Sequence, residues 1–130
     1  MWLRGAEFIE SEVSRAQEAL KAIHGGQPPR LFRAPYGVRW PGLAAAQQRH
    51  GLLGVMWSAI GRDWSDGGDA VAARLERGAR PGAILCLHDG RELAARPDLS
   101  TTIAALQRLL PVLAERGYAV ESVSGLLLGP

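Results

Sequence analysis

The sequence is poor in the residues that mark disulfide-bonded or membrane-spanning proteins. Cys86 is the single cysteine among 130 residues, so no disulfide can form within the chain. Its apolar neighbours favour a buried structural thiol over a nucleophile, because no adjacent cation would activate it. No apolar run is long enough to span a bilayer. Residues 1–5 lack the apolar core of a signal peptide, so the sequence indicates no particular compartment.

The sequence also lacks an excess of charge of either sign. Lys and Arg number 15 against 13 Asp and Glu, a net charge of +2. The arginines are scattered without a stripe or block, which argues against a nucleic-acid partner. No glycine-rich loop opens a helix after a strand, which argues against a flavodoxin-like phosphate-binding domain. A hydrophobic content of 47% with 22% charged residues is typical of a soluble domain with a real core.

Apolar residues at helical spacing alternate with short apolar runs. They predict helices at residues 6–24, 41–50 and 99–116, a further helix after Asp69, and a final turn after Ser124. Pro41 is expected in the first turn of its helix, and Pro111 is expected to kink the long one. Asp69 and Ser124 are expected to cap the helices that follow them.

The apolar runs between these helices predict strands at residues 31–34, 52–57, 83–87 and 118–120. The runs at 52–57 and 83–87 are nearly continuous, as in parallel strands covered on both faces. The alternation of helix and strand predicts an α/β fold with about four parallel strands in one domain.

Three short strings follow three of the predicted strands: Arg33-Ala34-Pro35-Tyr36-Gly37, Asp63-Trp64 and Leu85-Cys86-Leu87-His88. The carboxyl ends of parallel strands share one face of a sheet, where ligands and chemistry collect. We therefore expect the polar and aromatic side chains of the three strings to meet in one cleft. Asp63 and His88 are expected within hydrogen-bonding reach or one water apart.

Each of these residues also has a plainer interpretation when taken alone. Arg33 could be a surface residue at a strand end, Asp63 a turn residue, and His88 a core histidine at the end of an apolar strand. His24 and His50 are interpreted as helix-end residues that interact favourably with the negative, C-terminal end of the helix dipole. The joint order and spacing of the strings is what favours a functional site.

In that order and spacing the strings resemble the later motifs of the polysaccharide deacetylase family, the NodB-homology domain or carbohydrate esterase family 4. The resemblance covers essentially residues 1–130, read as a single partial domain. It implies the C-terminal part of a distorted (β/α) barrel. It also implies metal-dependent hydrolysis of N-acetyl or O-acetyl groups on a polysaccharide or amino sugar, with an acetylated glycan as the substrate.

The resemblance also implies catalytic roles for four residues. His88 matches the general acid for the leaving amine, and Asp63 matches the carboxylate that tunes this histidine. The backbone N–H of Tyr36 matches the donor to the oxyanion. Arg33 matches the arginine that holds a catalytic aspartate. Two further matches concern substrate binding, since Trp64 and Leu85 correspond to residues of the sugar groove and acetyl pocket.

The first two motifs of the family are missing from this sequence. They supply the catalytic base and the ligands of a divalent metal, zinc or similar, and the three histidines here have no metal-binding spacing. We therefore expect an N-terminally truncated domain that is inactive alone and associates with itself through the bare edge of the strand at 31–34. The alternative is a non-catalytic carbohydrate-binding or structural remnant without the metal centre.

Overall fold

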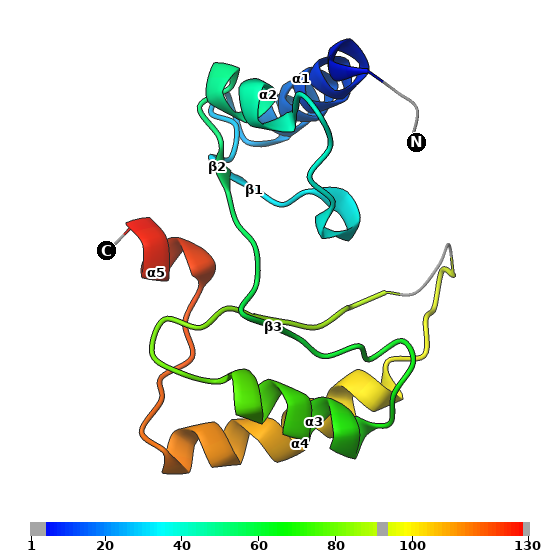
Figure 1. Cartoon of the computed structure of the whole chain (residues 1–130), viewed down its shortest axis with the longest axis vertical. Coiled ribbons are helices and arrows are strands. Elements are labelled where there is room, and N and C mark those ends of the chain that lie inside the picture. The colour runs from blue at the N-terminus through cyan, green and yellow to red at the C-terminus, as the bar shows by residue number, and fades with distance from the viewer. Residues whose placement is uncertain (1–4, 91–93, 129–130) are drawn as a thin grey trace. The chain divides into compact units, whose positions relative to one another are not determined.

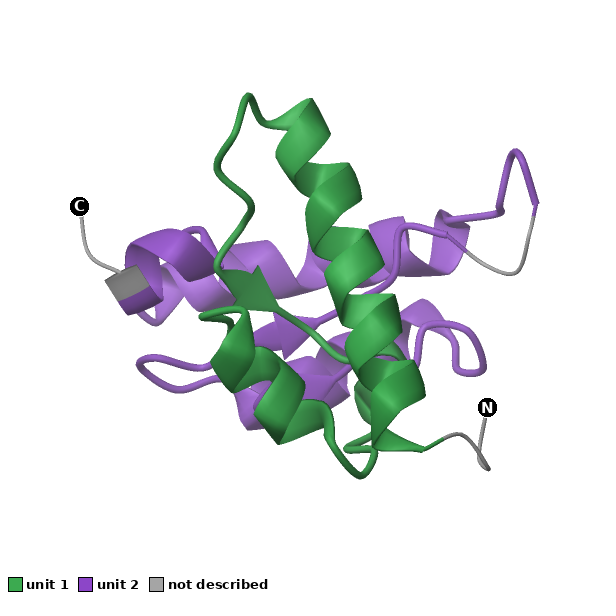
Figure 2. Cartoon of the chain, turned by 90° about the horizontal axis from the view of Figure 1, so that it is seen from above, with its two compact units in different colours: residues 1–56 green, residues 57–130 purple. Residues whose placement is uncertain are grey.

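The computed structural model describes residues 5–90 and 94–128. The chain divides into two compact units, residues 1–56 and residues 57–130, coloured green and purple in Figure 2. The first unit holds α1 (Ala6–Ile23), β1 (Leu31–Phe32), the 3₁₀ turn η1 (Pro35–Gly37), α2 (Leu43–Arg49) and β2 (Leu53–Gly54). The second holds β3 (Ala59–Ile60), α3 (Gly68–Gly78), β4 (Leu85–Cys86), α4 (Ser100–Glu115) and α5 (Val123–Leu128).

In the first unit, α1 and α2 pack beside a two-stranded parallel sheet. Leu31 of β1 is opposite Leu53 of β2, and Phe32 is opposite Gly54. The core comes from the apolar faces of both helices and from the residues after β1, with Ile9, Val13, Ala34, Leu43 and Ala46 buried. Burial of this apolar surface holds the helices on the sheet, because two-residue strands contribute few ladder hydrogen bonds.

The second unit repeats this arrangement with a different pair of strands. β3 and β4 are parallel, with Ala59 opposite Leu85 and Ile60 opposite Cys86. Helices α3 and α4 lie side by side (Figure 1) and enclose the core of this unit. That core consists of Val71, Ala72, Leu75, Ala105, Leu109 and Leu113. Both ends of the loop between β3 and α3 are therefore anchored to packed elements.

The predicted helices at 6–24, 41–50 and 99–116 are confirmed with small shifts at their ends. Pro41 was expected inside its helix, but it precedes it, because Gly42 adopts a left-handed φ of 86° and the helix begins at Leu43. A side chain at Gly42 would stand 2.5 Å from the Ala6 Cβ atom, so the starts of α1 and α2 meet closely there. Pro111 lies within the continuous helix α4.

The two predicted caps are wrong. Helix α3 begins at Gly68 after Gly67, so Asp69 lies in its first turn. There the positive end of the helix dipole stabilises the Asp69 carboxylate, which also pairs with Arg108 at 2.8 Å. Ser124 lies inside α5, and the Ser122 hydroxyl accepts the Gly125 N–H at 3.1 Å in its place. Both helices start earlier than the apolar pattern indicated, because that pattern marks the buried face and not the first residue.

Parallel strands are confirmed, but two of the strand predictions need correction. The run at 52–57 contains β2, and the chain then changes partner: the Ser58 N–H donates to the Ile84 carbonyl at 2.7 Å, next to a separate strand, β3. Residues 118–120 form no strand in the part of the chain that the structure describes. The Tyr118 N–H instead donates to the Leu113 carbonyl at 2.9 Å, which caps the C-terminal end of α4. Val120 is 71% exposed.

Candidate functional site

The loop of residues 61–66, between β3 and α3, presents two of the predicted site residues. Arg74 of α3 holds both ends of this loop, donating to the Gly61 carbonyl and to the Asp66 carboxylate, each at 2.5 Å. The hydrogen bonds from Arg74 and Ser65 lower the pKa of the Asp66 carboxyl. Between these anchors Arg62 has a φ of 59°, a left-handed conformation that is rare outside glycine. The loop is thus fixed by specific contacts rather than by regular structure.

Asp63 is the buried centre of the site, with its side chain 2% exposed. Its Oδ1 atom lies 2.8 Å from Nδ1 of His88. Its Oδ2 atom accepts the His88 backbone N–H at 2.9 Å and the Thr102 hydroxyl at 2.6 Å. Burial alone would raise the pKa of the Asp63 carboxyl, but the hydrogen bonds from Thr102 and His88 outweigh it and hold the pKa below its ordinary value of 3.8. The carboxylate is therefore ionised at neutral pH.

His88 follows β4 and is held by Asp63 through both its ring and its backbone. The predicted contact between the two residues is thereby confirmed. Because the carboxylate accepts from Nδ1, that nitrogen carries a proton and Nε2 is left for exchange with a ligand. The His88 side chain is 39% exposed, so it can be reached from solvent. This is the geometry of an acid–base histidine oriented by a carboxylate.

Trp64 lies beside this pair. Its ring meets the His88 ring edge-on, with centroids 4.9 Å apart and planes at 88°. Trp64 is 40% exposed, so part of the indole remains accessible next to the histidine. Asp63, Trp64 and His88 therefore form one cluster, which we call the dyad site.

Arg33 and Tyr36 belong to the other unit, and their place in a common cleft with the dyad site stays a prediction. The Arg33 Nε atom donates to the Val55 carbonyl at 3.2 Å, which ties the residue after β1 to the residue after β2. Tyr36 has a φ of 57° and is 91% exposed. The hydrogen bonds of its turn come from the Gly37 and Val38 N–H groups, and neither uses the Tyr36 N–H.

Leu85 and its neighbour Cys86 lie in β4, directly before the dyad site. Leu85 is partly buried against the core of the second unit, and Cys86 is buried, as expected of a structural thiol. A place for Leu85 in an acetyl pocket stays a prediction. His24 and His50 follow the last residues of α1 and α2, as expected.

The residue that sequence reasoning missed is Thr102. It lies in the first turn of α4, 39 positions after Asp63, and its hydroxyl also stands 3.3 Å from the His88 carbonyl oxygen. In the sequence, Thr102 lies in the first turn of the predicted helix at 99–116 and was not singled out. A threonine in a first turn is a common helix feature, so its sequence carries no sign of a distant acceptor.

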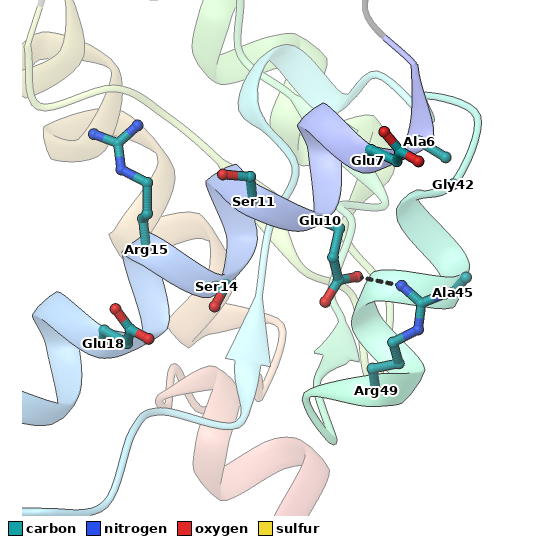
Figure 3. Close-up of a pocket in the computed structure, with 10 residues that line it drawn as sticks. All are labelled: Ala6, Glu7, Glu10, Ser11, Ser14, Arg15, Glu18, Gly42, Ala45 and Arg49. Atoms are coloured by element: carbon teal, nitrogen blue, oxygen red, sulfur yellow. Dashed lines mark hydrogen bonds and ion pairs between the residues drawn. The ribbon is translucent and has the colours of Figure 1, made fainter.

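A hollow of about 530 Å³ lies between α1 and α2 and is shown in Figure 3. Across it, Glu10 accepts from Arg49 at 2.8 Å and pairs with His50 at 2.9 Å. Burial would raise the pKa of Glu10, but these hydrogen bonds outweigh it and lower the pKa. None of the predicted site residues lines this hollow. The pairs that Glu10 makes with Arg49 and His50 join the two helices.

The described residues do not fit a divalent metal. Within residues 5–90 and 94–128, no group of three or more His, Cys, Asp or Glu side chains comes close enough to hold one. Asp63 and His88 face each other, and their facing atoms are used in that contact. No helix in the same residues is both long and apolar enough to cross a membrane.

No protein-family model matches the chain. Among curated proteins, the chitooligosaccharide deacetylase of Sinorhizobium fredii is 36% identical over 125 residues, covering 92% of this chain and 58% of that protein. The peptidoglycan-N-acetylglucosamine deacetylase of Bacillus cereus is 35% identical over 102 residues, covering 76% of this chain and 46% of that protein. The chain spans about half the length of the curated relatives it matches.

Solved structures give the same result. A family 4 carbohydrate esterase from Streptomyces lividans, in complex with acetate, has a TM-score of 0.74 and 31% identity, covering 95% of this chain and 60% of that one. A family 4 pseudoenzyme from Bacillus anthracis shares the fold, with a TM-score of 0.79 at 23% identity over 98% of this chain and 42% of that one. Together with the dyad site, these matches identify the chain as part of a NodB-homology domain of the polysaccharide deacetylase family, carbohydrate esterase family 4.

Proposed function

We propose that the chain supplies the proton-transfer part of an active site that removes N-acetyl groups from amino sugars in a glycan. The observation that carries this proposal is the contact between the buried Asp63 carboxylate and the ring of the accessible His88. A proton-transfer pair of this kind serves a step in which a leaving group must gain a proton. The names of the relatives, which deacetylate chitooligosaccharides or peptidoglycan N-acetylglucosamine, support the choice of substrate.

In the proposed step, water has already added to the acetamide carbonyl carbon. The carbon–nitrogen bond of this tetrahedral adduct breaks, its electron pair goes to the sugar nitrogen, and the C=O bond of the departing acetate re-forms. The Nε2–H of protonated His88 gives its proton to that nitrogen, so the product leaves as a neutral amine. Asp63 accepts the Nδ1–H throughout. Its negative charge stabilises the protonated ring, and its hydrogen bonds keep Nε2 turned outward. Since Asp63 stays ionised, it orients the histidine without taking the proton itself.

The other candidate residues are proposed to bind the substrate. Trp64 offers a partly exposed indole beside His88, which suits packing against a sugar ring. The Tyr36 N–H is proposed as an oxyanion donor, since the hydrogen bonds of its turn leave it unused. Leu85 is proposed for the acetyl pocket. Arg33 is proposed to hold a carboxylate that this chain does not supply.

Deacetylases of carbohydrate esterase family 4 are generally metal-dependent, and the resemblance implies zinc or a similar divalent ion. The described residues of this chain do not form a site for such an ion. We therefore propose that the 130-residue chain alone releases no acetate from an N-acetylated oligosaccharide with zinc or cobalt added. Acetate release that depends on the metal would show that ligands were missed.

A chimera tests the proposed function directly. The 125 residues of the Sinorhizobium fredii deacetylase that match this chain are replaced by this chain, and acetate release from a chitooligosaccharide is measured. The chimera should be active, and His88→Ala should lower its activity by about 100-fold or more. His24→Ala, a helix-end histidine, is the matched control and should leave activity unchanged.

A folded but inactive chimera would instead favour the non-catalytic alternative, a remnant that binds carbohydrate without hydrolysing it. Binding of the same chitooligosaccharide to the folded chimera, measured by calorimetry, would then support that second function. An active chimera in which His88→Ala has no effect would refute the role of the dyad site while leaving the activity in place.

We also propose that the isolated chain associates with itself through the edge of β1. In the described residues β1 pairs with β2 alone, so its other edge carries unpaired backbone groups. Such edges favour pairing with another chain. Light scattering should show dimers or larger species of the isolated chain. A stable monomer at high concentration would contradict this proposal.

A further inference from the structure

A third side chain, outside the dyad, fixes the Asp63 carboxylate. Thr102 reaches it from the first turn of α4, with Oγ1 2.6 Å from Oδ2 of Asp63. A threonine in a helix often turns its hydroxyl back to a carbonyl of its own preceding turn. Here the acceptors are the Asp63 carboxylate and the His88 carbonyl, both far away in sequence. The hydroxyl therefore serves the dyad site and not its own helix.

The remaining contacts of the carboxylate show why this third donor matters. His88 contributes two donors to Asp63, its ring at 2.8 Å and its backbone N–H at 2.9 Å, and the backbone of Asp63 itself also hydrogen-bonds to the carboxylate. Among the described residues, Thr102 is therefore a donor that belongs neither to Asp63 itself nor to the residue that Asp63 has to orient. Thr102 adds an anchor from a different element, whose position is set by the core packing of Ala105 and Leu109.

The position of Thr102 also brings the carboxylate to the start of a helix. The first turn of α4 has backbone N–H groups without partners inside the helix, and the helix dipole is positive at this N-terminal end. A carboxylate at this end is favoured as the ion. Among the described residues, His88 is a titratable group in contact with Asp63, while Asp66 of the same loop pairs with Arg74 of α3.

We propose that Thr102 is a positioning residue, which holds the Asp63 carboxylate in the orientation that keeps the Nδ1 proton on His88 and turns Nε2 toward the substrate. This proposal rests on the proposed function for its link to catalysis. The physical claim, that the hydroxyl sets the state of the dyad, holds or fails by itself. The tests below keep the two apart.

The first test measures the dyad without substrate. In the full chain, the Asp63 carboxyl is titrated by carbon-13 NMR, and the His88 Nδ1 proton is followed in the proton spectrum. Thr102→Val keeps the shape and removes the donor, so the pKa of Asp63 should rise by about half a unit or more. The Nδ1 proton should exchange faster with water. Thr102→Ser restores a hydroxyl and should restore both signals.

Thr101→Val is the matched control, since it makes the same chemical change one residue earlier, where no contact with the dyad is seen. It should leave both signals as in the parent. If Thr102→Val does not fold, Thr102→Ala removes the hydroxyl with less bulk and is measured in the same way. Parent-like signals in the folded Val or Ala variant, or an equal shift in Thr101→Val, would overturn the proposal.

The second test measures catalysis in the active chimera described above. Thr102→Val should lower kcat by about 10-fold, change KM little, and shift the acid limb of the pH profile. Thr102→Ser should recover most of kcat. Shifted NMR signals with an inactive parent chimera would overturn the proposed function and leave the positioning role intact. If the chimera is active and Thr102→Val leaves its kcat and pH profile unchanged, the positioning role is overturned.

Discussion

Replacing Asp63 by asparagine tests how the carboxylate organises the dyad site. Asparagine has one acceptor oxygen, and two donors, the His88 N–H and the Thr102 hydroxyl, meet the same carboxylate oxygen. The asparagine oxygen is expected to remain there. Its NH₂ group then faces Nδ1 of His88, and two donors cannot share that contact. The ring must therefore release its Nδ1 proton and carry a proton on Nε2.

The magnitude follows from the bonds that change. All three hydrogen bonds to the charged carboxylate become bonds between neutral groups, about half as strong, and the one to Nδ1 of His88 reverses its direction. Hydrogen bonds to charged groups contribute about 1.5–3 kcal/mol each. The Asp63 side chain is 2% exposed, but its partner His88 is 39% exposed, which favours a low figure. We expect Asp63→Asn to lower the free energy of unfolding by about 2 kcal/mol near neutral pH.

The pH dependence of this loss has a definite sign. The pKa of Asp63 is lowered in the folded chain, so its stabilisation is present above the ordinary value of 3.8. It is lost as the pH falls through the lower folded value. The parent and Asp63→Asn should therefore differ most near neutral pH and converge on the acid side of 3.8.

Urea denaturation at several pH values measures these free energies, and nitrogen-15 NMR reports which ring nitrogen of His88 is protonated. A difference below about 0.5 kcal/mol near neutral pH would refute the reasoning. So would a difference that stays constant into the acid range, or a His88 ring that keeps its Nδ1 proton in the variant.

Two further predictions concern the backbone. Gly78→Ala should lower the free energy of unfolding by about 1–3 kcal/mol, because its Cβ atom would stand 2.4 Å from that of Ala59. Gly90 has open space around it, so the control Gly90→Ala should change the free energy of unfolding by less than about 0.5 kcal/mol. Equal losses in the two variants, measured by urea denaturation, would contradict this prediction. Tyr36→Gly should raise the free energy of unfolding by about 0.5–1 kcal/mol, because the left-handed backbone at φ 57° is strained for a side chain that is 91% exposed. Tyr36→Ala keeps that strain, so an equal gain in it would refute the explanation.

The sequence allowed the dyad to be predicted because strand ends are a strong constraint. Asp63 and His88 each follow a short apolar run, and parallel pairing brings the ends of two such runs together. Helix α1 was predicted for a similar reason, since its apolar residues repeat with the helical period over its whole length. Both predictions depend on regular patterns that the buried face of an element imposes on the sequence.

The parts that failed depend on partners rather than on patterns. The run at 52–57 looks like one strand, since nothing in its composition marks the point where the chain leaves β1 and turns to β4. Residues 118–120 are suited to a strand, yet a strand forms only where another lies beside it. Thr102 was missed because its acceptor is distant in sequence. Hydrogen-bond partners across a fold leave no local trace.

The central claim is that His88, oriented by Asp63, gives a proton to the leaving nitrogen. It is tested most directly by comparing two substrates of the active chimera, an N-acetylated chitooligosaccharide and an aryl acetate ester whose phenolate leaves without a proton. His88→Ala should lower kcat/KM by about 100-fold or more for the amide, and should change it little for the ester. Equal losses on both substrates, or no loss on the amide, would contradict the account.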